Sequence, residues 1–141
     1  MADAMSDYLE NQILDHILTG AGGSWTAPTT VYCALFTSTA SLAELEAGTL
    51  TNEVANSNAY ARTAITFGTP AASGTISNSA DCTFPAASGG NWGTVRFAAL
   101  MDGNTHGAGN VLFYGQLTAD KIVNDGDTFK FNIGDWDVTI A

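Results

Sequence analysis

The sequence predicts a mainly β fold, an antiparallel β-sandwich or barrel-like domain of roughly seven strands with one N-terminal amphipathic α-helix. Three observations support this fold class. Helical spacing of apolar residues is largely confined to the start of the chain, and short alternating segments separated by Gly-, Pro-, Asn- and Asp-containing turns follow it. The length of 141 residues suits one domain. We therefore expect a single domain over residues 1–141, with the helix at 6–19 and an antiparallel β core at 29–141.

The N-terminal helix is predicted from its apolar spacing. Leu9, Ile13 and Ile17 recur at four-residue steps, and Asp7 and Glu10 have the spacing of a capping box. Three glycines then end the helix. Because an isolated helix this short is marginal in water, its apolar stripe is expected to cover one face of a sheet.

Seven segments have the alternation of β-strands. In the first of them, "VYCALF", both faces are apolar, which predicts a central strand covered on both sides, with the N-terminal helix as a candidate cover. The last two segments are predicted to pair as a hairpin, and "LAELEAG" to form one short helical turn with a solvated acidic side. The predicted strands span residues 29–38, 60–67, 74–84, 92–101, 111–118, 128–132 and 136–140.

The charge of the chain excludes several classes of protein. Four Lys and Arg residues against 14 Asp and Glu residues give a net charge of −10, which repels nucleic acid and anionic headgroups. The apolar runs are far shorter than the ~20 residues that span a bilayer. The N-terminus has acidic residues where a secretory signal needs basic ones. We therefore expect synthesis in a cytoplasm, with no nucleic-acid partner and no membrane association.

The sequence contains no convergent set of catalytic residue types. Its two histidines lie apart, His16 on the predicted helix surface and His106 in a glycine-rich turn, where we expect a solvated loop tip. Signatures of nucleophile elbows, P-loops, zinc proteases and dithiol motifs are missing from the sequence. We therefore expect no enzymatic activity and no cofactor.

Four aspartates near the C-terminus, Asp125, Asp127, Asp135 and Asp137, raise the question of a metal site. Their alternating oxygen ligands would suit Ca²⁺ if the two loops converged. Turn chemistry explains the same residues, because Asn and Asp side chains close tight turns beside a permissive glycine. Turn chemistry is the favoured interpretation, and we predict no metal.

The two cysteines, Cys33 and Cys82, lie in apolar or β-like segments. Two cysteines do not build the disulfide framework of a small secreted domain. We interpret both as buried thiols, and a single bridge between them stays open because the sequence does not say whether their strands are adjacent.

The segment "NAYARTAITF" contains one of the few basic side chains, Arg62. Strand parity places Arg62 on the side of Tyr60 and away from Ile65 and Phe67, which disfavours burial in the main core. We expect it to form a structural ion pair or to stack on Tyr60.

Two tryptophans, Trp25 and Trp92, lie in predicted loops, whereas most of the other aromatic residues occupy strand positions. Capping of the core is the favoured interpretation of both side chains. An aromatic platform that binds sugar is the alternative.

Several strings along nearly the whole chain together resemble a family of small tailed-bacteriophage virion proteins, labelled tail fibre-like or head decoration proteins. The strings are "DYLENQILDHIL", "VYCALFTS", "AYARTAITF", "ISNSADCTFPAA", "WGTV", "VLFYGQLT" and "GDTFKFNIGDWDVTI". The resemblance implies a non-enzymatic phage structural protein located in the virion. A chain low in charge and rich in Gly, Ala, Ser and Thr is consistent with packing against copies of itself or a shell.

Two roles follow from the resemblance. The favoured one is a head decoration (cement) protein on the head exterior, which binds the major capsid protein in the assembled lattice and stabilises it, with a trimer matching local threefold symmetry. The alternative is a tail or tail-fibre component that acts in tail assembly or host attachment. Contacts with the partner or between copies are expected from the helix and from residues 42–58. The candidate contact residues are Tyr8, Asn11, Trp25, Tyr60, Arg62 and Trp92.

Overall fold

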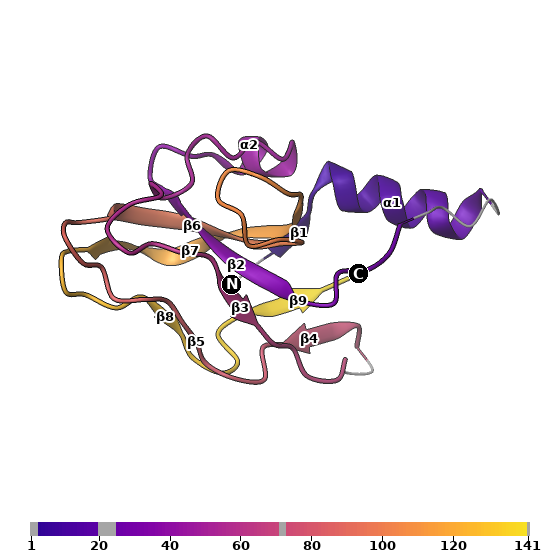
Figure 1. Ribbon diagram of the computed structural model, residues 1–141. Coiled ribbons are helices and arrows are strands. Elements are labelled where there is room, and N and C mark those ends of the chain that lie inside the picture. The colour runs from indigo at the N-terminus through magenta and orange to yellow at the C-terminus, as the bar shows by residue number, and fades with distance from the viewer. Residues whose placement is uncertain (1–2, 20–24, 71–72, 141) are drawn as a thin grey trace.

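The computed structural model describes residues 3–19, 25–70 and 73–140. Within these ranges the chain forms nine strands and two helices, and every strand pair is antiparallel (Figure 1). The mainly β class with one N-terminal helix is therefore confirmed. The elements are β1 (Asp3–Met5), α1 (Asp7–Leu18), β2 (Val31–Thr37), α2 (Leu42–Glu46), β3 (Thr63–Ile65), β4 (Thr75–Ser77), β5 (Cys82–Thr83), β6 (Gly93–Met101), β7 (Val111–Val123), β8 (Lys130–Phe131) and β9 (Asp137–Thr139).

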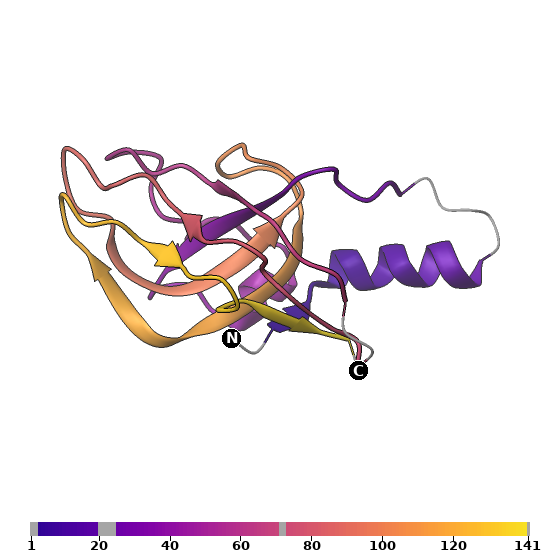
Figure 2. The same cartoon turned by 90° about the horizontal axis from the view of Figure 1, so that it is seen from below.

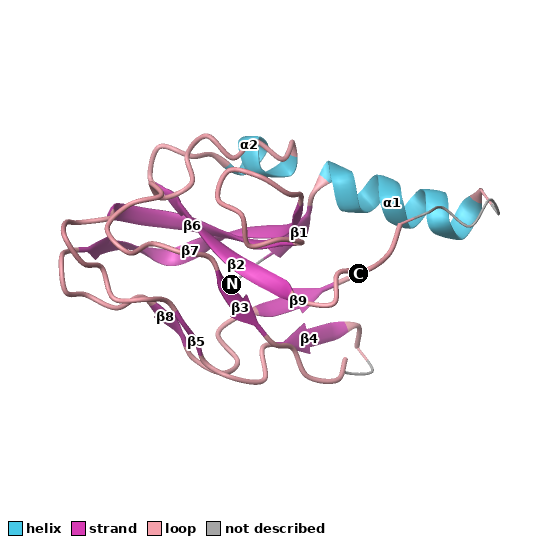
Figure 3. Cartoon of the chain, in the orientation of Figure 1, coloured by secondary structure: helices cyan, strands magenta, loops and turns pink. Residues whose placement is uncertain are grey.

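The strands form an open two-layer arrangement. One layer is a five-stranded sheet in the order β1-β7-β6-β2-β3, and the other consists of two strand pairs, β4-β9 and β5-β8 (Figure 3). The predicted terminal hairpin is wrong, because β8 and β9 pair with β5 and β4 and not with each other. The buried Asn78 explains the difference. Its side chain binds Asn132 O and Trp136 N, and its backbone binds Gly134 N and Trp136 O. These hydrogen bonds occupy backbone groups that a hairpin of β8 and β9 would need.

Apolar side chains cover both faces of the five-stranded sheet. On one face Cys33 and Leu35 join the main core, which includes the β4, β5, β8 and β9 layer. On the other face Ala34 and Phe36 pack in a second cluster with Leu45 of α2. The prediction of a central strand with two apolar faces is confirmed, but the proposed cover is corrected: α2 packs there, while α1 projects beyond the sandwich (Figure 2).

The root of α1 is anchored to β7. Ser6 is the N-cap, and its hydroxyl accepts a hydrogen bond from Leu9 N and donates one to Val111 O. The predicted capping box of Asp7 and Glu10 is wrong by one residue, because with Ser6 at the N-cap the third helical position is Leu9. Just before the helix lies β1, a three-residue strand paired with β7 that is too short for alternation to reveal.

The predicted strand over 60–67 is shortened to β3. Asn58 and Ala59 adopt positive φ angles of 53° and 65°, a left-handed conformation that interrupts extended backbone before β3 begins. Asn58 O accepts hydrogen bonds from Trp92 Nε1 and Ser88 N, which hold this turn in place. Similarly, the predicted strand over 74–84 is divided into β4 and β5 around the buried Asn78.

Leu35 offers a direct test of the main core, because this β2 residue has no exposed surface. We expect Leu35→Ala to lower the free energy of unfolding by about 2–5 kcal/mol, since it leaves a cavity that the surroundings fill only in part. The measurement is urea unfolding followed by tryptophan fluorescence. Leu42→Ala is the matched control at an exposed position of α2, and a similar loss in both variants would contradict this description of the core.

Candidate interaction site

A buried ion pair joins Arg62 to Glu53. Arg62 Nε lies 2.8 Å from Glu53 Oε1 and Arg62 Nη2 lies 2.8 Å from Glu53 Oε2, so the contact is bidentate, and both side chains are fully buried. The structural ion pair expected for Arg62 is present. Parity disfavoured burial of Arg62 in the main core. Arg62 is buried, but in a polar contact with Glu53, and it precedes β3, so strand alternation does not apply to it.

Hydrogen bonds with Tyr60 and with the 102–110 loop satisfy this ion pair. Arg62 Nη1 donates to Gly103 O at 2.9 Å and to Ala108 O at 2.8 Å. Glu53 accepts from Tyr60 OH at 3.1 Å and from Gly107 N at 3.0 Å. Because buried charges are tolerated only when they are paired and hydrogen-bonded, these contacts fix the 102–110 loop against residues 53–62.

Tyr60 and Trp92 belong to the same buried group as the ion pair. The rings of Tyr60 and Trp92 meet edge to face with centroids 5.3 Å apart, and Tyr60 OH also accepts a hydrogen bond from Leu35 N at 3.0 Å. Trp92 Nε1 donates to Asn58 O at 2.8 Å. Trp92 thus caps the core, as favoured from the sequence. Burial and the negative charge of Glu53 raise the pKa of the Tyr60 hydroxyl, so it stays protonated and acts as a donor.

His106 lies against this group and not at a solvated loop tip. Its Nε2 is 2.9 Å from Val54 O and 4.0 Å from Glu53 Oε2, and its ring meets Tyr60 edge to face. The prediction for His106 is therefore wrong. The reason is that the Arg62 contacts draw the 102–110 loop inward. His16, in contrast, is exposed on α1, as predicted.

The carboxyl group of Glu53 is tuned by opposing effects. Burial raises its pKa, but hydrogen bonds from Arg62 and Gly107 N, together with the positive charge of Arg62, outweigh burial. The net pKa lies below the ordinary value of 4.5. Glu53 is therefore ionised in the folded protein at neutral pH, which the ion pair requires.

The two cysteines are buried thiols, as predicted, and form no disulfide. Cys33 on β2 and Cys82 on β5 lie close enough for their thiols to hydrogen-bond, which lowers the pKa of Cys82. Their two strands belong to different layers of the core, so the thiols help to fill the space between the layers.

Two of the four C-terminal aspartates, Asp127 and Asp135, close turns, whereas Asp125 and Asp137 bind residues of distant segments. Asp127 Oδ2 accepts from Asn124 N and Asp135 Oδ2 accepts from Asn132 N, each closing a turn over three residues. Asp125 accepts from Gly89 N, and Asp137 accepts from the Ser77 hydroxyl. In the part of the chain that the structure describes, His, Cys, Asp and Glu side chains form no group of three or more that could hold a metal ion.

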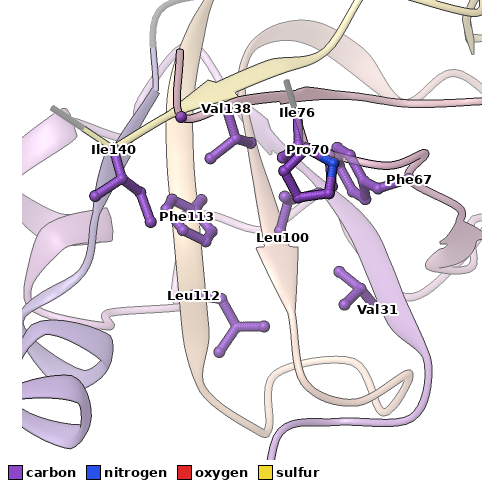
Figure 4. Close-up of a pocket in the computed structure, with 10 residues that line it drawn as sticks. Val31, Phe67, Pro70, Ile76, Leu100, Leu112, Phe113, Val138 and Ile140 are labelled. Carbon is purple, nitrogen blue, oxygen red and sulfur yellow. The ribbon is translucent and has the colours of Figure 1, made fainter. Parts of the chain in front are cut away.

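An apolar groove of about 440 Å³ opens between the two layers beside the root of α1 (Figure 4). Its lining comes from β2, β4, β6, β7, β9 and the segment that follows β3. Sequence analysis missed this groove, because six distant segments contribute one or two residues each and no local pattern marks them. The principal lining residues are Val31, Phe67, Ile76, Leu112, Val138 and Ile140.

The other predicted contact residues lie on the N-terminal part of the chain. On α1, Tyr8 is half-buried against the main core and Asn11 is exposed. Trp25 is also half-buried against the core, so it has the capping position expected of it. The structure thus brings Tyr60, Arg62 and Trp92 together and leaves the N-terminal three apart from them. The role of all six in partner contacts stays a prediction.

These features define a class of protein. The described residues use their buried aromatic, acidic and basic side chains to fix loops, and the apolar groove has no charged lining residue, which together are typical of a structural β protein. The chain belongs to the family described as "Podophage GP4 fiber I protein gp80", which matches residues 4–139. It is therefore a structural protein of the tailed-phage virion, as the sequence resemblance implied.

A search of curated proteins found no match to this chain. Among the described helices, neither is long and apolar enough to cross a membrane.

The ion pair predicts a large effect of Arg62→Ala. Removing the guanidinium leaves the Glu53 carboxylate buried without its partner. We therefore expect the free energy of unfolding to fall by about 3–5 kcal/mol. The matched control is Arg96→Ala, which breaks the exposed contact with Asp120 at 2.7 Å and should cost at most about 1 kcal/mol. Equal stability losses, measured by denaturant unfolding, would contradict a structural role for Arg62.

The lowered pKa of Glu53 predicts a specific dependence of stability on pH. The unfolded chain binds the Glu53 proton at higher pH than the folded chain does, so this stabilisation is complete above about pH 4.5 and is lost as the pH falls through the lower folded pKa. Glu53→Gln lacks this titration. We therefore expect the stability difference between wild type and Glu53→Gln to narrow on acidification. Urea unfolding at a series of pH values measures this, and a constant difference would contradict it.

Proposed function

We propose that this protein is a fibre component of the virion that acts in tail assembly or host attachment. The match of residues 4–139 to a phage fibre family supports this proposal. It favours the alternative drawn from the sequence over the head decoration role, because the family description names a fibre.

The charge and the architecture are consistent with a protein that binds other proteins. The net charge of −10 disfavours nucleic acid as a partner. The helix α1 projects from the sandwich and carries the exposed Asn11, so it is the element we propose for contacts with other virion proteins (Figure 2). Tyr8 lies in its first turn and Trp25 in the segment that follows it; both are half-buried against the core and belong to the same proposed surface. Residues 1–141 would act as one domain.

Tyr60, Arg62 and Trp92 would contribute to binding indirectly. Their side chains are buried, so in this proposal they fix residues 42–58 and the 102–110 loop in the shape that a partner recognises. If these segments lost their fixed shape, incorporation into the virion would be impaired, although no atom that touches the partner would have been removed. The same two segments would also serve binding to the major capsid protein if the protein decorated the head.

Location and copy number in the virion test the proposal. Gold-labelled antibody and quantitative mass spectrometry of purified virions should place a few to a few dozen copies on fibres. Phage lacking the protein should adsorb poorly to host cells, yet their heads should release DNA at the wild-type temperature. Hundreds of copies on the head, with DNA released at a lower temperature when the protein is missing, would instead establish the decoration role and overturn our proposal.

A further inference from the structure

The outer half of α1 carries apolar side chains that are largely exposed. Leu14, Ile17 and Leu18 are 54%, 67% and 72% exposed, whereas Leu9 near the helix start is buried. Figure 2 shows the helix extending away from the sandwich. A helix of 12 residues is marginal when it is not packed, so its last turns gain most from a cover. We call Leu14, Ile17 and Leu18 the α1 ridge.

The apolar groove between the layers is concave where the α1 ridge is convex, and both surfaces are made of apolar side chains. Its volume of about 440 Å³ lies in the range of ligand pockets, which is roughly 300–1,000 Å³. Pockets for metabolites add a few convergent polar side chains that orient the ligand. Here the lining side chains are hydrocarbon throughout, which suits aliphatic protein side chains better than a polar small molecule.

We propose that the α1 ridge of one copy packs into the groove of a second copy of this chain. Each chain supplies both surfaces, and the two differ from each other, so the contact is heterologous. The root of α1 and the strands β4 and β9 lie at the same end of the molecule (Figures 1 and 2). Repetition of the contact around an axis at this end gives each copy one donated and one accepted helix, which allows a closed ring.

The effect of charge on binding distinguishes a second copy of this chain from a basic partner. Each copy carries a net charge of −10, and α1 itself bears Asp7, Glu10 and Asp15, so two copies repel each other at long range. The groove lining contains no charged side chain that would oppose the helix at short range. Salt shortens the screening length from about 30 Å at 0.01 M to about 8 Å at 0.15 M. Self-association should therefore strengthen with salt, whereas binding to a basic partner would weaken.

The test uses three variants of the full chain that keep its net charge. The ridge variant is Leu14→Gln with Ile17→Gln and Leu18→Gln, in which glutamine preserves helix propensity. The groove variant is Phe67→Gln with Ile140→Gln. The control is Ile122→Gln with Ile133→Gln, two isoleucines that are 68% and 64% exposed outside both surfaces. Far-UV circular dichroism and thermal unfolding establish that each variant is folded.

Sedimentation equilibrium in 0.15 M salt measures association. We expect wild type and control to form the same oligomer, and the ridge and groove variants each to raise the dissociation constant by about tenfold or more. A mixture of the ridge and groove variants should recover a heterodimer, because it contains one intact ridge and one intact groove. A monomeric wild type at several hundred micromolar, an unaffected groove variant or no recovery in the mixture would each overturn the proposal.

Cross-linking gives a second readout that does not depend on the glutamine variants. Ile17→Cys and Ile140→Cys proteins, mixed and mildly oxidised, should form a disulfide heterodimer, whereas Ile17→Cys mixed with Ile122→Cys should not. Preferential Ile17→Cys homodimers would show helix-to-helix pairing and overturn the proposal. Because purified protein is used, failure here leaves the proposed fibre role standing, and a failed fibre role leaves this contact standing.

Discussion

The buried ion pair between Arg62 and Glu53 is the interaction on which the loop end of the sandwich depends. Each charge is tolerated there only because the other is present and because Tyr60, Gly107 and two loop carbonyls complete the hydrogen bonding. The same atoms fix residues 53–62 and the 102–110 loop relative to β2. A polar cluster thus determines loop positions that apolar packing alone would leave less defined.

The pairing of basic residues explains the surface charge of the protein. Three of the four lysines and arginines, Arg62, Arg96 and Lys130, form ion pairs with carboxylates. Little positive charge therefore remains to offset 14 acidic residues. Association of such a surface with another copy depends on apolar contact and works against long-range repulsion. The projecting α1 ridge and the uncharged groove are the two features that meet this requirement.

Local sequence patterns predicted some elements of the fold correctly and others incorrectly. The apolar alternation of β2 and the four-residue spacing of α1 were sufficient to predict both elements and the two-faced burial of β2. The strand at 60–67 was overestimated because left-handed turns at Asn58 and Ala59 depend on Trp92 and Ser88, far along the chain. The prediction of a terminal hairpin was wrong because the buried Asn78 competes for backbone groups of the 132–136 turn.

The same limit applies to the candidate site. Tyr60, Arg62 and Trp92 were identified because aromatic and basic residues are scarce and their positions stand out. The partner of Arg62 was not identified, since Glu53 lies nine residues away in a loop without periodicity. His106 was misplaced for a related reason: its contact with Val54 spans 52 residues and exists only because Arg62 holds the intervening loop.

By itself the sequence determined the antiparallel β class, the amphipathic N-terminal helix, the two-faced central strand and the acidic surface. These are properties of composition or of consecutive residues, and local periodicity records them. Only the tertiary structure decided which strands pair, where the buried charge finds its partner, that α1 leaves its outer apolar side chains exposed, and that an apolar groove opens between the layers. Those outcomes depend on competition among distant segments for the same hydrogen bonds and the same apolar surface, and no short stretch of sequence contains that competition.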